Sequence, residues 1–160
     1  GPHVPGNHSS TEIQAACLLG QMERLEQIIR VRRERAEYLN ERFRDVPGLI
    51  PAPLNSDEIE STFHLYLLQV DPEVLGADIR PFKALLTEKG VTNIPHFAPL
   101  YHFTIYKQLG YDTDAIAASC PNAENAFWHT FTHLPLYPLR DEQVDTMADL
   151  VIETANEIRG

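Results

Sequence analysis

Apolar residues recur every three or four positions through the first quarter of the chain, which is the spacing of one helix face. The pattern follows Ser9-Ser10-Thr11-Glu12, a sequence typical of a capping box in which a serine and Glu12 satisfy the first backbone groups. It continues to about Arg44, and Pro47-Gly48 ends it. A single helix of this length spans about 50 Å, with Gly20 as the expected point of bending. Because a globule of this size is shorter, one end should project or pack against another body.

The remainder of the chain alternates short apolar runs with helical patterns. The expected elements are a central strand at 62–70, a helix at 81–89 capped by Asp78, a strand at 91–97, helices at 100–109 and 123–131, an edge strand at 134–137, and a final helix from Asp141. This order predicts an α/β (α+β) fold in which helices cover a small sheet. We expect two parts, an N-terminal loop and long connecting helix at 1–45 and a small domain at 46–160.

Composition narrows the classes of function. The formal net charge of −10 lacks the basic footprint of a nucleic-acid-binding protein. No apolar run approaches the length of about 18 residues that a membrane span needs, and residues 1–6 do not resemble a secretory signal. Cys17 and Cys120 have no ligand spacing, so we expect two reduced, buried thiols in a cytoplasmic protein.

Two groups of polar residues each allow two interpretations. Six arginines lie between Arg30 and Arg44, interleaved with glutamates, and form either an anion-binding face or a solvated helix face with pairs one turn apart. His129 and His133 have the spacing of a zinc-chelating pair. However, no glutamate follows His129, and Leu134-Pro135 suggests that His133 has left the helix, so no metal ion is expected.

The segment from Pro95 to Phe103 is the most interesting candidate site. It places His96, Tyr101 and His102 in a proline-rich aromatic loop after a short strand, where α/β proteins often contact ligands. The alternative is a rigid turn whose aromatic rings pack inward. No nucleophile triad and no glycine-rich phosphate loop is readable. The lysines are Lys83, Lys89 and Lys107, the first two expected on a solvated helix.

Several stretches, in this order, resemble the C-terminal part of one enzyme family. They are Gly6-Asn7-His8-Ser9-Ser10-Thr11-Glu12-Ile13-Gln14-Ala15-Ala16, Leu19-Gly20-Gln21-Met22-Glu23-Arg24-Leu25, Phe63-His64-Leu65-Tyr66, His96-Phe97-Ala98-Pro99-Leu100-Tyr101, Cys120-Pro121-Asn122-Ala123-Glu124 and Leu134-Pro135-Leu136. The family is the DegT/DnrJ/EryC1/StrS group of aminotransferases, which depend on pyridoxal phosphate (PLP) and have the aspartate-aminotransferase fold. The resemblance runs from about Gly6 to the end of the chain.

This resemblance implies an aminotransferase of keto-sugars or keto-cyclitols in amino-sugar or antibiotic biosynthesis. In the family, the Schiff-base lysine and the carboxylate that contacts the PLP ring lie in a larger N-terminal domain, and none of the three lysines matches that motif. The chain is therefore expected to supply no catalytic residue, to bind no PLP alone and to be inactive alone. The alternative is a standalone, non-catalytic module for binding or assembly.

The resemblance also implies roles for particular residues. Asn7 and His8 match the segment that reaches the cofactor phosphate of the partner subunit, so a homodimer through this loop and the long helix is expected. Ser9 stands where the family commonly has arginine, which removes a cationic phosphate contact. His96 and Tyr101 match the loop at the substrate entrance.

Overall fold

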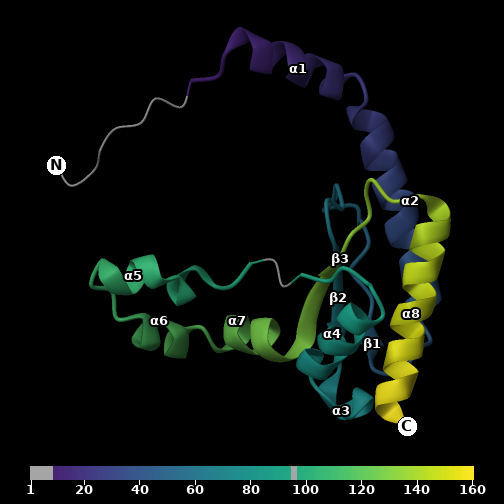
Figure 1. The fold of residues 1–160 in the computed structure, drawn as a ribbon, viewed down its shortest axis with the longest axis vertical. Coiled ribbons are helices and arrows are strands. Elements are labelled where there is room, and N and C mark those ends of the chain that lie inside the picture. Colours follow the sequence, from purple (N-terminus) through teal and green to yellow (C-terminus); the bar gives the residue numbers. More distant parts are fainter. Residues whose placement is uncertain (1–8, 95–96) are drawn as a thin grey trace.

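The computed structural model describes residues 9–94 and 97–160. The expected long helix is present but interrupted, as α1 (Glu12–Met22) and α2 (Leu25–Phe43). The interruption falls at Glu23 and Arg24 rather than at Gly20. There the Arg24 N–H donates to the Gln21 carbonyl three residues back, at 3.0 Å, so the regular four-residue ladder stops. As a result α1 turns away from α2 (Figure 1).

The capping box at the start of α1 uses other residues than expected. Thr11, not a serine, is the N-cap, and its hydroxyl accepts from the Gln14 N–H at 3.3 Å. The Gln14 side chain accepts in return from the Thr11 N–H at 2.8 Å. The reciprocal geometry of the motif holds, because Gln14 stands three residues after the cap, whereas Glu12 is too close to reach back.

A three-stranded antiparallel sheet forms the centre of the molecule, in the order β1 (Leu49–Ile50), β2 (Tyr66–Val70) and β3 (Phe131–Leu134). The expected central strand is β2, but only one of its faces is buried. Tyr66 and Leu68 point into the core, whereas Leu67 is 43% exposed. The strand therefore has one covered face and one open face.

The other elements include two helices that the sequence did not predict, at 72–75 and 113–119, and otherwise follow the predicted order with shifted bounds. They are α3 (Pro72–Leu75), α4 (Ile79–Glu88), the 3-10 turn η1 (Leu100–His102), α5 (Thr104–Gln108), α6 (Thr113–Ser119), α7 (Pro121–Asn125), the π-helical turn η2 (Ala126–Thr130) and α8 (Asp141–Arg159). Asp78 caps α4 as predicted. Among the described residues of the strand expected at 91–97, only Ile94 pairs, in an isolated bridge with His133. The edge strand predicted at 134–137 lies earlier, as β3. Arg140, not Asp141, precedes α8 as its N-cap.

The core lies between the buried face of the sheet and helices α2, α4 and α8 (Figure 1). Tyr66 is its largest fully buried side chain, and its ring meets Phe43 of α2 edge to face, with centroids 6.0 Å apart. The Tyr66 hydroxyl donates to Asn40 Oδ1 at 2.5 Å and accepts from the Ala52 N–H at 3.4 Å. Asn40 Nδ2 donates to the Ala52 carbonyl at 2.6 Å, so three hydrogen bonds form a closed ring.

Two extensions leave this core on the same side, as Figure 1 shows. One is α1, which has no buried residue and exposes Ile13, Leu18, Leu19 and Met22 by 60–78%. The other is residues 97–130, from η1 to η2, which we call the arm. None of the helices in the described ranges is long and apolar enough to cross a lipid bilayer.

Gly48 links α2 to β1 and is expected to tolerate no side chain. Its φ of +85° is in the left-handed region, and a Cβ would lie 3.0 Å from the Cα of Leu75. Gly48→Ala should lower the free energy of unfolding by more than the roughly 1–2 kcal/mol that a left-handed L-residue costs. Gly76→Ala is the control, because Gly76 has a φ of +81° and nothing near the added Cβ. Urea unfolding followed by circular dichroism measures both, and equal losses would show that the Leu75 contact is unimportant.

Candidate functional site

Of the four site residues predicted from the sequence, the described structure contains only Tyr101. Asn7, His8 and His96 lie outside the described residues. Tyr101 lies in η1, directly after Pro99, whose fixed backbone starts the turn. The arm therefore carries the described part of the candidate site.

A carboxylate on α7, that of Glu124, gathers polar groups from two other turns of the arm. His102 Nε2 lies 2.7 Å from Glu124 Oε1, and Trp128 Nε1 donates to Glu124 Oε2 at 3.0 Å. Glu124 and Trp128 are four residues apart and thus stand on one side of the same helix. One carboxylate oxygen therefore contacts the His102 ring of η1, and the other accepts from the Trp128 ring of η2. Glu124 in this way connects the two turns.

Tyr101 faces the same carboxylate. Its hydroxyl is screened from solvent and lies outside standard hydrogen-bond geometry with Glu124. Burial, with a further contribution from Glu124, raises the pKa of Tyr101 to about 12. In return, Tyr101, followed by His102 and Trp128, holds the pKa of Glu124 below its ordinary value. Glu124 is therefore an ionised acceptor at neutral pH.

Aromatic rings surround the His102 imidazole. Its centroid lies 4.8 Å from Tyr101, 5.7 Å from Trp128 and 6.3 Å from Phe127, and the Phe127 ring is stacked nearly parallel. These contacts restrict the rotation of the imidazole about its side-chain bonds. Tyr101 and His102 thus pack against the arm, but 31% of the His102 side chain stays exposed. Phe97 and Phe103 of the same loop are 72% and 40% exposed, so the interpretation as a turn whose rings pack inward holds only in part.

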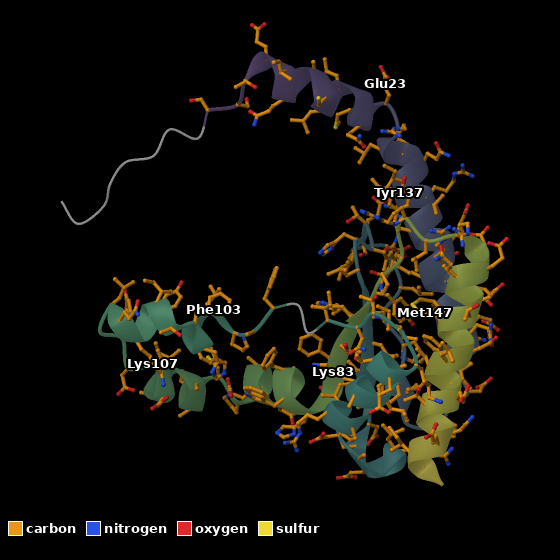
Figure 2. All side chains as sticks on the ribbon, viewed as in Figure 1. Glu23, Lys83, Phe103, Lys107, Tyr137 and Met147 are labelled. Carbon is orange, nitrogen blue, oxygen red and sulfur yellow. The ribbon has the colours of Figure 1, made fainter. Side chains whose placement is uncertain are left out.

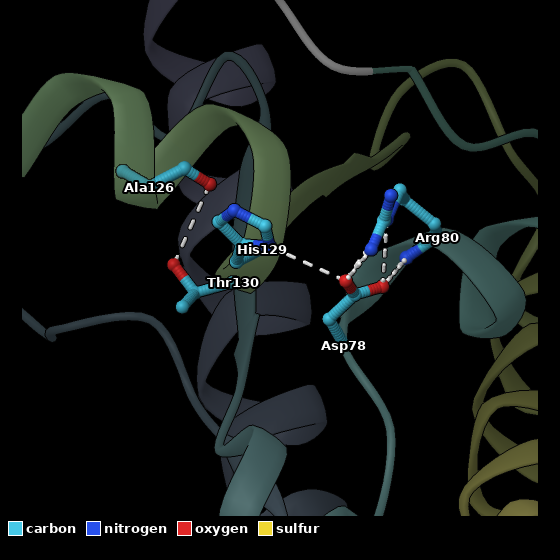
Figure 3. Close-up of polar contacts among 5 residues, drawn as sticks. All are labelled: Asp78, Arg80, Ala126, His129 and Thr130. Atoms are coloured by element: carbon cyan, nitrogen blue, oxygen red, sulfur yellow. Dashed lines mark hydrogen bonds and ion pairs between the residues drawn. The ribbon is translucent and has the colours of Figure 1, made fainter.

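The base of the arm is fixed to the core by the π-helical turn η2. The turn continues α7 and directs His129 towards Asp78, with His129 Nδ1 3.2 Å from Asp78 Oδ2 (Figure 3). Asp78 accepts from the Arg80 N–H at 2.9 Å as the N-cap of α4, and also binds the Arg80 guanidinium. Arg80, with a smaller contribution from His129, holds the pKa of Asp78 well below its ordinary range.

The two histidines four residues apart lie on different elements. His129 belongs to η2 and His133 to β3, as Leu134-Pro135 had suggested. Within residues 9–94 and 97–160, no three His, Cys, Asp or Glu side chains are grouped to hold a metal ion. Both cysteines are free, but Cys17 is exposed on α1 and Cys120 is only half-buried, so the expectation of two buried thiols is wrong. A cysteine on a helix with no covering element cannot be buried.

The arginine-rich segment mainly ties α2 to the rest of the molecule. Arg30 pairs with Glu34 at 3.7 Å and Arg44 with Glu41, as expected of a solvated face. The others reach out, to the carboxylates of Glu60, Asp141 and Asp149 and to the ring of Tyr137. Each of the six has a partner within the chain, which favours a structural role over anion binding.

The lysines differ from the expected pair on a solvated face. Lys89 lies between Glu153 and Glu157 of α8, at 2.5 and 2.9 Å. Lys107 pairs with Asp114 on the arm, at 3.5 Å. Lys83, labelled in Figure 2, lies on α4. Its side chain is half-buried, and burial lowers its pKa.

Sequence reasoning missed the residues that organise the arm. The spacing of Glu124 and Trp128 was visible, but the approach of His102 needs the fold of residues 103–123. Asp78 was recognised only as a helix cap, because nothing in the sequence places His129 beside it. Helix α6 was missed as well, although Asp112, its N-cap, is a residue typical of that position.

Comparisons with known proteins show which family the chain belongs to. The sequence profile of the DegT/DnrJ/EryC1/StrS aminotransferase family matches residues 4–152. The chain belongs to this family. It is 36% identical over 143 residues to the spore coat polysaccharide biosynthesis protein SpsC of Bacillus subtilis, covering 88% of this chain and 35% of that protein.

Two further relatives extend the comparison. A dTDP-4-dehydro-2,3,6-trideoxy-D-glucose 4-aminotransferase of Saccharopolyspora spinosa is 31% identical over 93% of the chain and 34% of that enzyme. The putative sugar aminotransferase Spr1654 of Streptococcus pneumoniae, solved in its PLP form, aligns with a TM-score of 0.78 and 26% identity over 94% of the chain and 37% of the solved chain. The chain thus has the predicted aminotransferase-like fold and spans about a third of the length of these relatives.

The charge of Asp78 is expected to stabilise the base of the arm in a pH-dependent way. Asp78→Asn keeps a good N-cap but removes the charge that faces Arg80 and His129. Because the pKa of Asp78 is lowered in the folded state, its contribution is present above the ordinary value of 3.8 and is lost as the pH falls through the lower folded value. The variant should therefore be less stable than the parent at pH 7, with a smaller difference at about pH 3.

Urea unfolding at both pH values measures this difference. Asp78→Ala, which also loses the cap, should cost roughly 1 kcal/mol more than Asp78→Asn at both. A difference between parent and Asp78→Asn that does not change with pH would contradict the assignment of the ion pair.

Proposed function

We propose that the chain is the C-terminal part of a PLP-dependent aminotransferase that acts on a keto-sugar or keto-cyclitol, in amino-sugar or antibiotic biosynthesis. The family match over residues 4–152 carries this proposal. The name of the Saccharopolyspora relative specifies a sugar with a ketone at C4 attached to a nucleotide, which is the class of substrate expected. Cytoplasmic location remains a prediction.

In this proposal the chain recognises substrate and contacts the partner subunit, without making or breaking bonds. Residues 1–45 form the loop and connecting helices, and residues 46–160 the small domain. PLP would supply the electron sink for amino transfer in the complete enzyme. Since none of the three lysines matches the Schiff-base motif of the family, we expect no PLP-dependent turnover by the 160-residue chain.

Asn7 and His8 are proposed to contact the cofactor phosphate of a partner subunit, and His96 and Tyr101 to line the substrate entrance. The structure adds a constraint for Tyr101, whose hydroxyl is screened from solvent beside Glu124. A sugar hydroxyl that reaches Tyr101 therefore enters an environment that already contains a carboxylate. A standalone binding module remains the second candidate, favoured by the lack of a lysine suited to PLP.

The homodimer is proposed to form through α1 and the N-terminal loop. Helix α1 is apolar on most sides, and its exposed Ile13 and Leu19 have no cover within the described chain. Large exposed apolar surfaces associate. We therefore expect the 160-residue chain to self-associate in multi-angle light scattering at high concentration. Ile13→Glu together with Leu19→Glu should shift it towards monomer, whereas a parent chain that stays strictly monomeric would contradict the proposal.

Amino transfer to a nucleotide-linked 4-keto-hexose by the complete enzyme is the test of the function. Its two half-reactions are measured separately by stopped-flow, and the 160-residue chain with PLP is the control expected to be inactive. Conversion of no keto-sugar or keto-cyclitol would overturn the proposed function and favour the binding module.

Tyr101→Phe is expected to lower kcat/KM for the keto-sugar about 5- to 100-fold, because an unmatched buried polar group costs roughly 1–3 kcal/mol. The half-reaction with the amino donor should change little. Tyr111→Phe is the matched control, because Tyr111 lies on the same arm with an exposed side chain. A silent Tyr101→Phe would mean that this residue only packs, and equal losses in both half-reactions would mean general support of the active site.

A further inference from the structure

The contact between Glu124 and His102 determines which imidazole nitrogen carries hydrogen. An ionised carboxylate only accepts hydrogen bonds, so at 2.7 Å from Glu124 Oε1 the Nε2 of His102 must be the donor. In a neutral imidazole the other nitrogen is then an acceptor. Within the described residues, Nδ1 of His102 has no partner, and the side chain is 31% exposed.

We propose that Glu124 is a positioning residue that holds His102 as the Nε2–H tautomer, so that His102 Nδ1 accepts a hydrogen bond from a hydroxyl of the sugar substrate. The proposal rests on the proposed function for the identity of the ligand. It adds His102 as a specificity residue to the loop for which the sequence indicated His96 and Tyr101. The arrangement follows the general use of a carboxylate to orient a functional imidazole.

The surroundings of His102 suit this role better than a purely structural one. The stacked Phe127 ring and the edge contact with Trp128 fix the plane of the imidazole. Trp128 Nε1 occupies the other oxygen of Glu124, so the carboxylate cannot rotate without losing a hydrogen bond. Because the ring is fixed, Nδ1 accepts best from a ligand hydroxyl that approaches from one direction. This is how a binding site distinguishes sugar epimers.

The tautomer can be measured without any enzymatic activity. Long-range ¹H–¹⁵N NMR of the 160-residue chain at about pH 9, well above the ordinary imidazole pKa of about 6.5, distinguishes a protonated from an unprotonated ring nitrogen. His102→Phe assigns the signals among the seven histidines. The expected result is a predominant Nε2–H form whose predominance is reduced in Glu124→Gln.

Glu88→Gln and His64→Gln are the controls, since both side chains are exposed with no described polar partner. They should leave the His102 signals unchanged. A predominant Nδ1–H form in the parent chain, or the same tautomer ratio in folded Glu124→Gln, would overturn the proposal whatever reaction the enzyme performs.

The hydrogen bond to the sugar is tested by kinetics of the complete enzyme with the keto-sugar that it converts. His102→Phe should raise KM for the sugar about 5- to 50-fold, the effect of losing one hydrogen bond to a buried polar group. His102→Asn, whose side-chain oxygen can occupy the place of Nδ1, should recover part of the loss. The amino-donor half-reaction should stay within about twofold in both variants.

An unchanged KM in His102→Phe would overturn the proposal while the proposed function stands. An equal effect of Phe and Asn would also overturn it, because the ring would then act by packing alone. If the complete enzyme converts no sugar, the proposed function fails, and the NMR measurement then decides whether Glu124 positions His102.

Discussion

Three hydrogen bonds around Tyr66 close the junction on which the described fold depends. Tyr66 is in the central strand, Asn40 is on α2 and Ala52 is in the loop between them, and each bonds to the other two. A buried phenol needs such partners, because an unsatisfied hydroxyl in the core costs about 1–3 kcal/mol. Since the ring of bonds is closed, moving any one of the three segments breaks two of them. The position of α2 relative to the sheet is therefore fixed by polar groups as well as by packing.

From this junction the ion pairs of α2 extend the fixed arrangement to α8. Arg35 donates to the Leu136 carbonyl at 2.7 Å and to Asp141 at 2.9 Å, with only 13% of its side chain exposed. Such a partly buried, multiply bonded arginine is more selective for geometry than an exposed pair. On the other side of α8, Lys89 of α4 lies between two glutamates. Helix α8 is thus held near its start by Arg35 of α2 and near its end by Lys89 of α4.

Sequence patterns predicted the parts of the fold that depend on local periodicity. The stripes of α2 and α8, the cap of α4 at Asp78 and the central strand all have strong local signals. What failed depends on distant contacts. The break at Glu23 and Arg24 has no proline or glycine at those two positions, and among the described residues of the strand expected at 91–97 only Ile94 pairs, with His133 of β3. In the candidate site, Tyr101 is proposed from the resemblance alone, whereas Glu124 becomes a centre of polar contacts only when the arm folds back and brings η1 onto α7.

The π-helical turn at Ala126–Thr130 has a consequence for how this arm changes over evolution. A π turn contains one residue more than the α turn that it replaces. Deleting one residue there would rotate everything beyond it by about 100° relative to α7. Trp128 would keep its hydrogen bond to Glu124 while His129 lost its contact with Asp78, or the reverse. The extra residue is what allows these two neighbouring side chains to reach carboxylates on different elements. A change in chain length by a single residue, without any change in core composition, is therefore a short route to an arm with a different orientation on the core.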